Sequence, residues 1–246
     1  MSGGGRPALG AVHVVVPVHD EEELLGMCLG ALQRAVARLR RTCPDLRVQT
    51  VVVLDGCTDG SAAVAHGSGL AVVTTPASGV GAARHAGVEA ARRRAAAAGR
   101  PVDPLATWLA CTDADSEVPE HWLVRQVDLA RAGADVVVGT VRPRLDELSP
   151  DRAAAWLATH DPHSANGHVH GANLGVRLST YLAAGGFAPV QEHEDVGLVL
   201  QARRSGAHVV ADAGCEVLTS ARLVGRTPGG YARHLREDLV TADQRT

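Results

Sequence analysis

The first half of the chain alternates short apolar runs with amphipathic segments. The β-branched run at 11–18 (AVHVVVPV) predicts a strand, and the acidic segment after it repeats its apolar positions at helical spacing. Further strands are predicted at 48–54, 70–75 and 108–111. Helices are expected around 61–66, over 77–99 and after 116, where Pro119 suits a first turn. Continuously apolar strands separated by helices predict a parallel sheet that is covered on both faces.

The second half of the chain is less regular. A strand at 136–138 precedes a helix-like stretch at 152–158 and a polar, histidine-rich loop. A helix in EHEDVGLVLQARRSG, a strand at 208–211 and a glycine-hinged tail with a final helix complete the pattern. We find no internal repeat and no linker between domains. Residues 1–10 are therefore expected to be a flexible lead-in, 11–225 a single domain, and 226–246 a C-terminal lid or helix.

Composition narrows the class of protein. Hydrophobic residues make up 46% of the chain, which suits a folded α/β domain, and aromatic residues only 2%, so Val, Leu and Ala must build the core. The formal net charge of −3 gives no basic field that would attract a nucleic acid. The five cysteines are scattered, which is typical of reduced thiols in a cytoplasmic protein. No apolar segment predicts a signal region or a membrane span.

Acidic residues follow several of the predicted strands. In parallel sheets ligands bind at the carboxyl ends of the strands, so these side chains are expected to line one crevice. They are Asp20, Asp55, Asp59, Asp113 and Asp115. In CTDADS (residues 111–116), extended backbone would point both aspartates the same way, as a pair of ligands for Mg²⁺ or Mn²⁺. An acidic turn before a helix would also explain these two aspartates.

Five segments in this order resemble glycosyltransferase family 2, whose members have the GT-A fold. They are VVVPVHDEEE, VVVLDGCTDGS, GVGAARHAG, CTDADS, and GGF with EHEDVGLVLQARRSG, and together they span about residues 11–222. The resemblance implies a Rossmann-like α/β fold with a mostly parallel sheet and helices on both faces. It implies a metal-dependent, inverting transfer of a sugar, of the hexosyltransferase type, from a nucleotide-diphosphate sugar to an acceptor hydroxyl. Residues 11–125 would be the nucleotide-binding half and 126–225 the acceptor half.

The resemblance also implies roles for the donor side of the crevice. Asp113 and Asp115 would hold the cation. Asp59 is equally well explained as a cap of the helix at 61–66. Arg84 stands where a dinucleotide fingerprint needs Gly or Ala, which disfavours a dehydrogenase; it would contact the nucleotide phosphates or else lie on a solvated helix face. The implied nucleotide-sugar contacts are Pro17, His19, Glu21, Asp55, Asp59, Arg84, Asp113 and Ala114.

On the acceptor side, the resemblance assigns the catalytic base to the Glu-Asp pair at a helix start. Asp195 is the first choice and Glu194 the second, because inverting transfer needs a carboxylate to take the proton of the attacking hydroxyl. Stabilisation of the helix start is the alternative. The implied acceptor contacts are His170, Gly171, Asn173 and Arg177. Zinc binding by His160, His163, His168 and His170 is a further alternative for this loop.

One departure from the family concerns the metal. Many relatives supply a late metal-binding histidine, whereas TSARLVGR contains none, so Arg222 is expected to act there on the diphosphate. Gly225, Gly229 and Gly230 would let the tail close as a lid. Two rival functions remain: a sugar-phosphate nucleotidyltransferase, although the acidic HDEEE loop is a poor triphosphate cradle, and a non-catalytic nucleotide-sugar-binding module.

Overall fold

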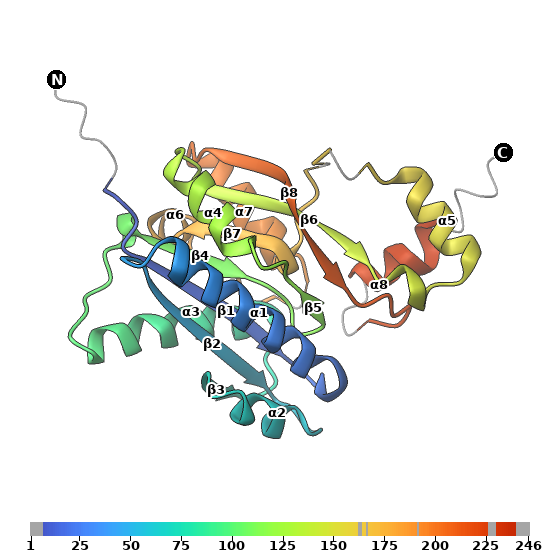
Figure 1. The fold of residues 1–246 in the computed structure, drawn as a ribbon, viewed down its shortest axis with the longest axis horizontal. Helices are drawn as coiled ribbons and strands as arrows, with labels where there is room; N and C mark the ends of the chain where they lie inside the picture. Colours follow the sequence, from blue (N-terminus) through green and yellow to red (C-terminus); the bar gives the residue numbers. More distant parts are fainter. Residues whose placement is uncertain (1–6, 162–163, 166, 191, 226–229, 240–246) are drawn as a thin grey trace.

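In the computed structural model, the chain folds into a mixed eight-stranded sheet between two layers of helices (Figure 1). The structure describes residues 7–161, 164–165, 167–190, 192–225 and 230–239. Its strands are β1 (Ala11–Val18), β2 (Arg47–Asp55), β3 (Ala71–Thr75), β4 (Thr107–Cys111), β5 (Ser116–Glu117), β6 (Val136–Pro143), β7 (Leu174–Arg177) and β8 (Val209–Thr219). Its helices are α1 (Glu22–Thr42), α2 (Ser61–Gly67), α3 (Val80–Ala97), α4 (Trp122–Arg131), α5 (Pro150–Thr159), α6 (Leu178–Ala183), α7 (Glu194–Arg204) and α8 (Tyr231–Arg233).

The strand order in the sheet is β3-β2-β1-β4-β7-β6-β8-β5. β1, β2, β3 and β4 pair in parallel with one another, as their apolar runs predict, and β6 pairs in parallel with β8. β7 is antiparallel to both β4 and β6, and β5 is antiparallel to β8. The expectation of a mostly parallel α/β sheet is confirmed, with β7 as the unforeseen strand that joins the two halves.

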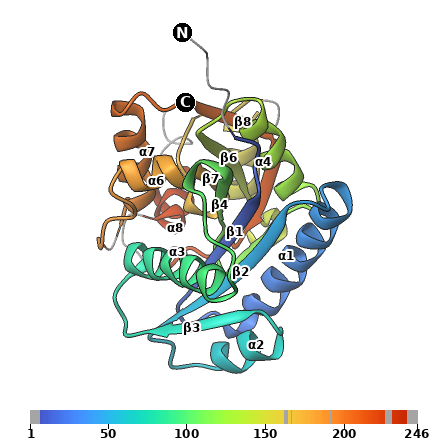
Figure 2. The ribbon, with the colours of Figure 1, turned by 90° about the vertical axis from the view of Figure 1, so that its left-hand side faces the viewer.

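The alternation of side chains along β1 divides the core between the two faces. Val12, Val14, Val16 and Val18 pack with residues of α1 and α4, whereas Val15 packs with residues of α3, α6 and α7. Figure 2 shows α1 and α3 on opposite sides of the strands. Because successive side chains point to opposite faces, a continuously apolar strand can serve two helical layers at once.

A third, smaller core lies beyond the ends of β6 and β8, where α5 and α8 lie side by side (Figure 1). Trp156 of α5 packs there with Ala221, Leu235 and Leu239. A final helix was expected in the tail, and α8 is a short one that continues as a π-helical turn to Asp238. Of the expected lid, residues 226–229 and 240–246 lie outside the described residues.

Two local expectations from the sequence need correction. Pro119 is not in the first turn of a helix: α4 begins at Trp122, and Pro119 accepts the backbone N–H of that residue in the preceding turn. The strand expected at 208–211 is the start of β8, which runs on to Thr219. Within the described residues, no helix combines the length and the apolar character needed to cross a bilayer.

His13 is a polar exception inside β1. Its side chain is only 3% exposed, and its Nδ1 has no hydrogen-bond partner among the described residues. Burial, together with the nearby positive charges of Arg47 and Arg92, lowers the pKa of His13 to about 4. The imidazole is therefore neutral at pH 7.

This burial makes a prediction about acid stability. The unfolded chain takes up a proton on His13 below pH about 6.5, whereas the folded chain does not until pH about 4, so stability falls as the pH is lowered between these values. Between pH 7.5 and 4.5 the wild type should lose about 2 kcal/mol more than His13→Val, measured by urea unfolding. The exposed His66 offers a control, since His66→Gln should follow the wild type. Equal losses in the wild type and His13→Val would contradict this account.

Candidate active site

The loops that follow β1, β2 and β4 meet at the carboxyl ends of the parallel strands. The ring of His19, just after β1, hydrogen-bonds through Nδ1 to the carbonyl of Asp55 at the end of β2, at 2.6 Å. Glu21 is buried, and its backbone N–H donates to Ser61 Oγ at 2.8 Å, which ties the start of α1 to the start of α2. Direct contacts therefore tie these loops together at the end of the sheet where the crevice is expected.

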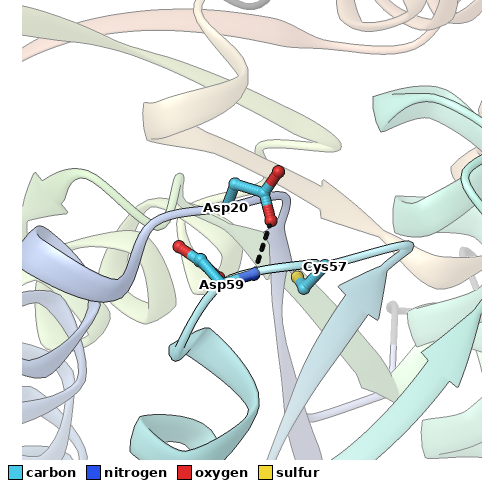
Figure 3. A group of neighbouring side chains, drawn as sticks. All are labelled: Asp20, Cys57 and Asp59. Atoms are coloured by element: carbon cyan, nitrogen blue, oxygen red, sulfur yellow. Dashed lines mark hydrogen bonds between the residues drawn. The ribbon is translucent and has the colours of Figure 1, made fainter.

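Asp20, Cys57 and Asp59 form a group whose potential ligand atoms lie within 4.8 Å of one another (Figure 3). Asp20 has a φ of 51°, and its carboxylate accepts the backbone N–H groups of Thr58 at 2.6 Å and Asp59 at 3.3 Å. The bond from Thr58 lowers the pKa of Asp20. The Asp20 carboxylate therefore accepts hydrogen bonds that fix the loop after β2.

Asp59 holds the starts of two helices. Its carboxylate accepts the backbone N–H of Ser61 at 2.9 Å and that of Glu22 at 3.0 Å. Unpaired N–H groups at helix starts are the usual partners of aspartate. Of the two interpretations that the sequence left open, these contacts favour the capping role.

Asp55 lies at the expected strand end, but its carboxylate is engaged by the loop before α3. It accepts hydrogen bonds from Thr75 Oγ1 at 2.9 Å, from Ser78 N and Ser78 Oγ at 3.0 Å each, and from Gly79 N at 2.9 Å. The side chain is 4% exposed. Asp55 thus shapes the wall of the crevice between β2 and α3.

Asp115 and Glu21 are joined by a single arginine. Arg222 Nη2 lies 2.5 Å from Asp115 Oδ2 and 2.7 Å from Glu21 Oε1. The other oxygen of Asp115 accepts Ser116 Oγ at 3.1 Å and Thr219 Oγ1 at 3.4 Å. Burial, reinforced by the nearby Asp113, raises the pKa of Asp115 to about 6, although Arg222 opposes this shift. The two carboxylates therefore form a site that already holds one positive charge.

Arg84 makes the second bridge. Its Nη2 pairs with Asp113 and its Nη1 with Glu194, and its side chain is only 3% exposed. The guanidinium carbon also lies 5.8 Å from the ring centre of Phe187. Arg84 does not lie on a solvated helix face. Its guanidinium is not free to contact a phosphate either, because both of its terminal nitrogens pair with carboxylates. Arg84 ties α3 to the loop after β4 and to α7.

Asp195 lies in the first turn of α7, beside this bridge. His193 begins the turn with a left-handed φ of 61°, and Asp195 Oδ1 accepts the backbone N–H of Val196 at 2.7 Å. Glu194 is buried against Arg84, whereas the side chain of Asp195 is partly exposed. Of the Glu-Asp pair, Asp195 is therefore the more exposed carboxylate, and its charge still acts on Arg84.

Aromatic rings gather around His170, at the end of the histidine-rich loop. His170 makes edge contacts with His168 and Tyr231, with ring centres 6.4 and 5.8 Å apart. Burial, followed by the proximity of His168, lowers the pKa of His170 to about 4. Gly171 lies against Arg84, and a Cβ there would overlap the guanidinium. Gly171 thus brings the end of this loop against the Arg84 bridge.

Among the described residues, the histidines of this loop do not gather into one metal site. His160 stacks on Trp156 at 3.9 Å and lies 2.8 Å from Glu216, apart from His168 and His170. His163 lies outside the described residues. Among the residues that the structure describes, the grouping of potential metal ligands contains no histidine. These contacts do not support the zinc alternative.

The structure does not support acceptor contacts for Asn173 and Arg177. Asn173 is 2% exposed, donates to the carbonyls of Thr140 and Cys215, and accepts Trp122 Nε1 at 2.8 Å. Arg177 pairs in register with Trp108 at the start of β4, at the far end of the strand from the crevice. Its guanidinium donates to backbone carbonyls, including that of Leu105 at 2.7 Å. Both residues hold the sheet and its helices together.

Pro17 and Ala114 are also buried. Pro17 lies within β1 opposite Val53, and Ala114 is part of the core between the sheet and α1. Thr219 contacts Asp115 and Phe187 contacts Arg84, and neither residue was predicted from the sequence as part of the site.

Acidic and basic side chains thus gather at the carboxyl ends of the strands, which is where ligands bind in open α/β sheets. The glycosyl transferase family 2 model matches residues 13–181, and the chain belongs to this family. No curated protein sequence matches the chain.

Solved structures show the same fold at low sequence identity. TarS residues 1–349 from S. aureus with UDP-GlcNAc is 12% identical over 90% of this chain and 61% of that one, with a TM-score of 0.60. PcManGT, a mannosyltransferase from Pyrobaculum calidifontis with GDP-Man and Mn²⁺, is 18% identical over 96% and 64%, with a TM-score of 0.59. Glucosyl-3-phosphoglycerate synthase from Mycobacterium tuberculosis, with Mn²⁺ and UDP-Glc, is 20% identical over 96% and 78%, with a TM-score of 0.51. The chain thus spans less than two thirds of the first two structures.

The Arg84 bridge predicts a large loss of stability when its charge is removed. Arg84→Met leaves Glu194 buried without a partner and should lower the free energy of unfolding by about 3–5 kcal/mol in chemical denaturation. Arg92→Met on the same helix removes a half-exposed arginine that pairs with Glu89, and should change it by less than about 1 kcal/mol. Similar losses in both variants would show that Arg84 is no more than a surface ion pair.

Proposed function

We propose that the chain is a metal-dependent, inverting glycosyltransferase that moves a hexose from a nucleotide-diphosphate sugar to an acceptor hydroxyl. Membership of family 2 supports the class of reaction and favours it over a nucleotidyltransferase. The observation that carries the proposal is the gathering of Glu21, Asp113, Asp115 and Asp195 at the carboxyl end of the sheet, around two arginines. Residues 11–125 and 126–225 remain our assignment of the donor and acceptor halves, with 226–246 as the lid.

A divalent cation fits the acidic side of this crevice. Arg222 already lies between Asp115 and Glu21, so these oxygens are arranged to neutralise a positive charge. We infer that Asp115 and Asp113 hold Mn²⁺ or Mg²⁺, whose chemistry is to stabilise the charge that develops on a diphosphate leaving group. Arg222 is then released to contact the same diphosphate, because a guanidinium fork suits phosphate oxygens.

The remaining donor contacts are proposed for the residues that line this edge. His19 and Glu21 follow β1, and Asp55 fixes the loop that would flank the nucleoside. The solved neighbours carry UDP- or GDP-sugars, two of them with Mn²⁺, which makes these nucleotides and this metal the first ones to test.

Asp195 is the proposed catalytic base. It is partly exposed, and Glu194 is engaged by Arg84, so Asp195 is the carboxylate of the pair that an acceptor hydroxyl can approach. It would take the proton of that hydroxyl as the oxygen attacks the anomeric carbon. His170 and Gly171 are proposed to contact the acceptor. His170 is neutral at pH 7 and lies against Tyr231.

The metal assignment predicts a conditional stabilisation by nucleotide. One nucleoside diphosphate among UDP, GDP, dTDP, ADP and CDP, at about a hundredfold over its dissociation constant with Mn²⁺, should stabilise the protein by roughly 2.7 kcal/mol. That corresponds to a rise of roughly 5–10 °C in thermal unfolding temperature. Asp115→Asn should abolish the dependence on Mn²⁺, whereas the exposed Asp128→Asn should keep it. A response that ignores Mn²⁺ in the wild type would remove the metal from the proposal.

The base assignment predicts a loss of turnover without a loss of binding. Asp195→Asn should retain the Mn²⁺-dependent response to nucleotide and lower kcat by about 10²–10⁴-fold, because proton transfer is removed while the donor site remains. Donor hydrolysis measured as release of nucleoside diphosphate supplies the assay before the acceptor is identified. Glu192→Gln, two residues before the pair, is the matched control and should keep its turnover. Unchanged turnover in Asp195→Asn would exclude Asp195 as the base.

A further inference from the structure

A cavity lies at the opposite end of the parallel strands from the candidate active site. Its volume is about 590 Å³, within the range of small-molecule sites. The first residues of β1, β2 and β3 line it on one side, and the last turn of α3 with residues 100–102 on the other. Because β1 runs from Ala11 to Val18 at about 3.3 Å per residue, roughly 20 Å separate the two sites.

Small apolar side chains form most of the wall. α3 ends in a run of alanines, of which Ala95, Ala97 and Ala98 line the cavity, and Val48 and Pro101 face it from other segments. The methyl side chain of alanine is too short to fill the space between the helix and the sheet. The cavity can therefore take an apolar group of a ligand without rearrangement of the chain.

Three arginines stand around the apolar wall. Arg47 begins β2, Arg94 lies in the last turn of α3, and Arg100 follows this helix. No acidic residue is among the described residues that line the cavity, and none of the three arginines forms an ion pair with a described residue. A helix C-terminus favours a cation such as Arg94, but this does not explain Arg47 or Arg100. The rim of the cavity thus carries an uncompensated positive charge.

His13 adds a polar group to the buried side of this wall. It lies on the α3 face of β1, two residues before Val15, at a position where the strand is otherwise apolar. It is 3% exposed and its Nδ1 lacks a partner among the described residues. A buried polar atom without a partner destabilises the protein that contains it. A ligand that hydrogen-bonds to the imidazole would remove that penalty.

We propose that this cavity binds a phosphorylated organic molecule with an apolar body. The guanidinium groups of Arg47, Arg94 and Arg100 take the phosphate, the alanine wall takes the apolar body, and His13 hydrogen-bonds to an oxygen of the phosphate ester. The site is separate from the donor crevice, so the inference does not rest on the proposed transfer reaction.

The test is calorimetric titration with 1-naphthyl phosphate, which joins an aromatic body to a phosphate, in buffer with EDTA. We expect one molecule bound per chain, and binding at least tenfold weaker for 1-naphthol and for inorganic phosphate, because each lacks one half of the ligand. Arg94→Gln combined with Arg100→Gln should weaken binding at least tenfold. Ala95→Phe, which fills the space, should do the same. Arg93→Gln, an exposed arginine of the same helix turn that does not line the cavity, should stay within twofold of the wild type.

Three results would overturn the proposal: absence of binding to the wild type, equal loss in Arg93→Gln and in the double variant, or loss of binding in Asp115→Asn. The last would place the probe in the donor crevice. Thermal unfolding checks that each variant is folded. If Ala95→Phe fails this check, the double arginine variant still decides, because both of its side chains are exposed. A negative result with 1-naphthyl phosphate would not affect the Mn²⁺-dependent response to nucleotide. The cavity proposal and the proposed function are therefore tested separately.

Discussion

The buried guanidinium of Arg84 is the interaction on which the crevice depends. It lies between Asp113, in the loop after β4, and Glu194, at the start of α7, and so connects segments from both halves of the chain. A buried charge is tolerated only when its partners compensate it, and each carboxylate here depends on the same cation. Small residues make the arrangement possible, since a Cβ at Gly171 would overlap Arg84 and one at Gly81 would overlap the carbonyl of Ala188.

Arg222 plays the corresponding part on the other side of the acidic pair. The first aspartate of CTDADS faces Arg84 and the second faces Arg222, so the repulsion between the two carboxylates is offset from both flanks. The two arginines differ in exposure, at 3% and 32% of the side chain. The inner bridge is therefore suited to a fixed structural role, and the outer one to exchange with a ligand of the same charge.

The sequence predicted those parts of the fold that depend on local patterns. Apolar runs located β1, β2, β3 and β4, and their ends located the aspartates of the crevice, because both follow from side-chain periodicity and strand direction. It did not predict the contacts that depend on packing across the sheet. Arg177 was expected to contact an acceptor. It lies instead beside Trp108 near the start of β4, because β7 runs antiparallel to β4. Asn173 was similarly misjudged, since its partners come from three distant segments.

The position of β7 in the sheet has a consequence for biosynthesis. This four-residue strand comes late in the chain but lies between β4 and β6, so neither has its neighbour on that side until residues 174–177 leave the ribosome. Unpaired strand edges invite association with other chains, and contacts between distant segments form slowly. The nascent chain therefore passes through a stage in which the hydrophobic strands of its first half are made but the sheet remains divided. Chaperones that shield exposed strand edges would act on this chain during that interval.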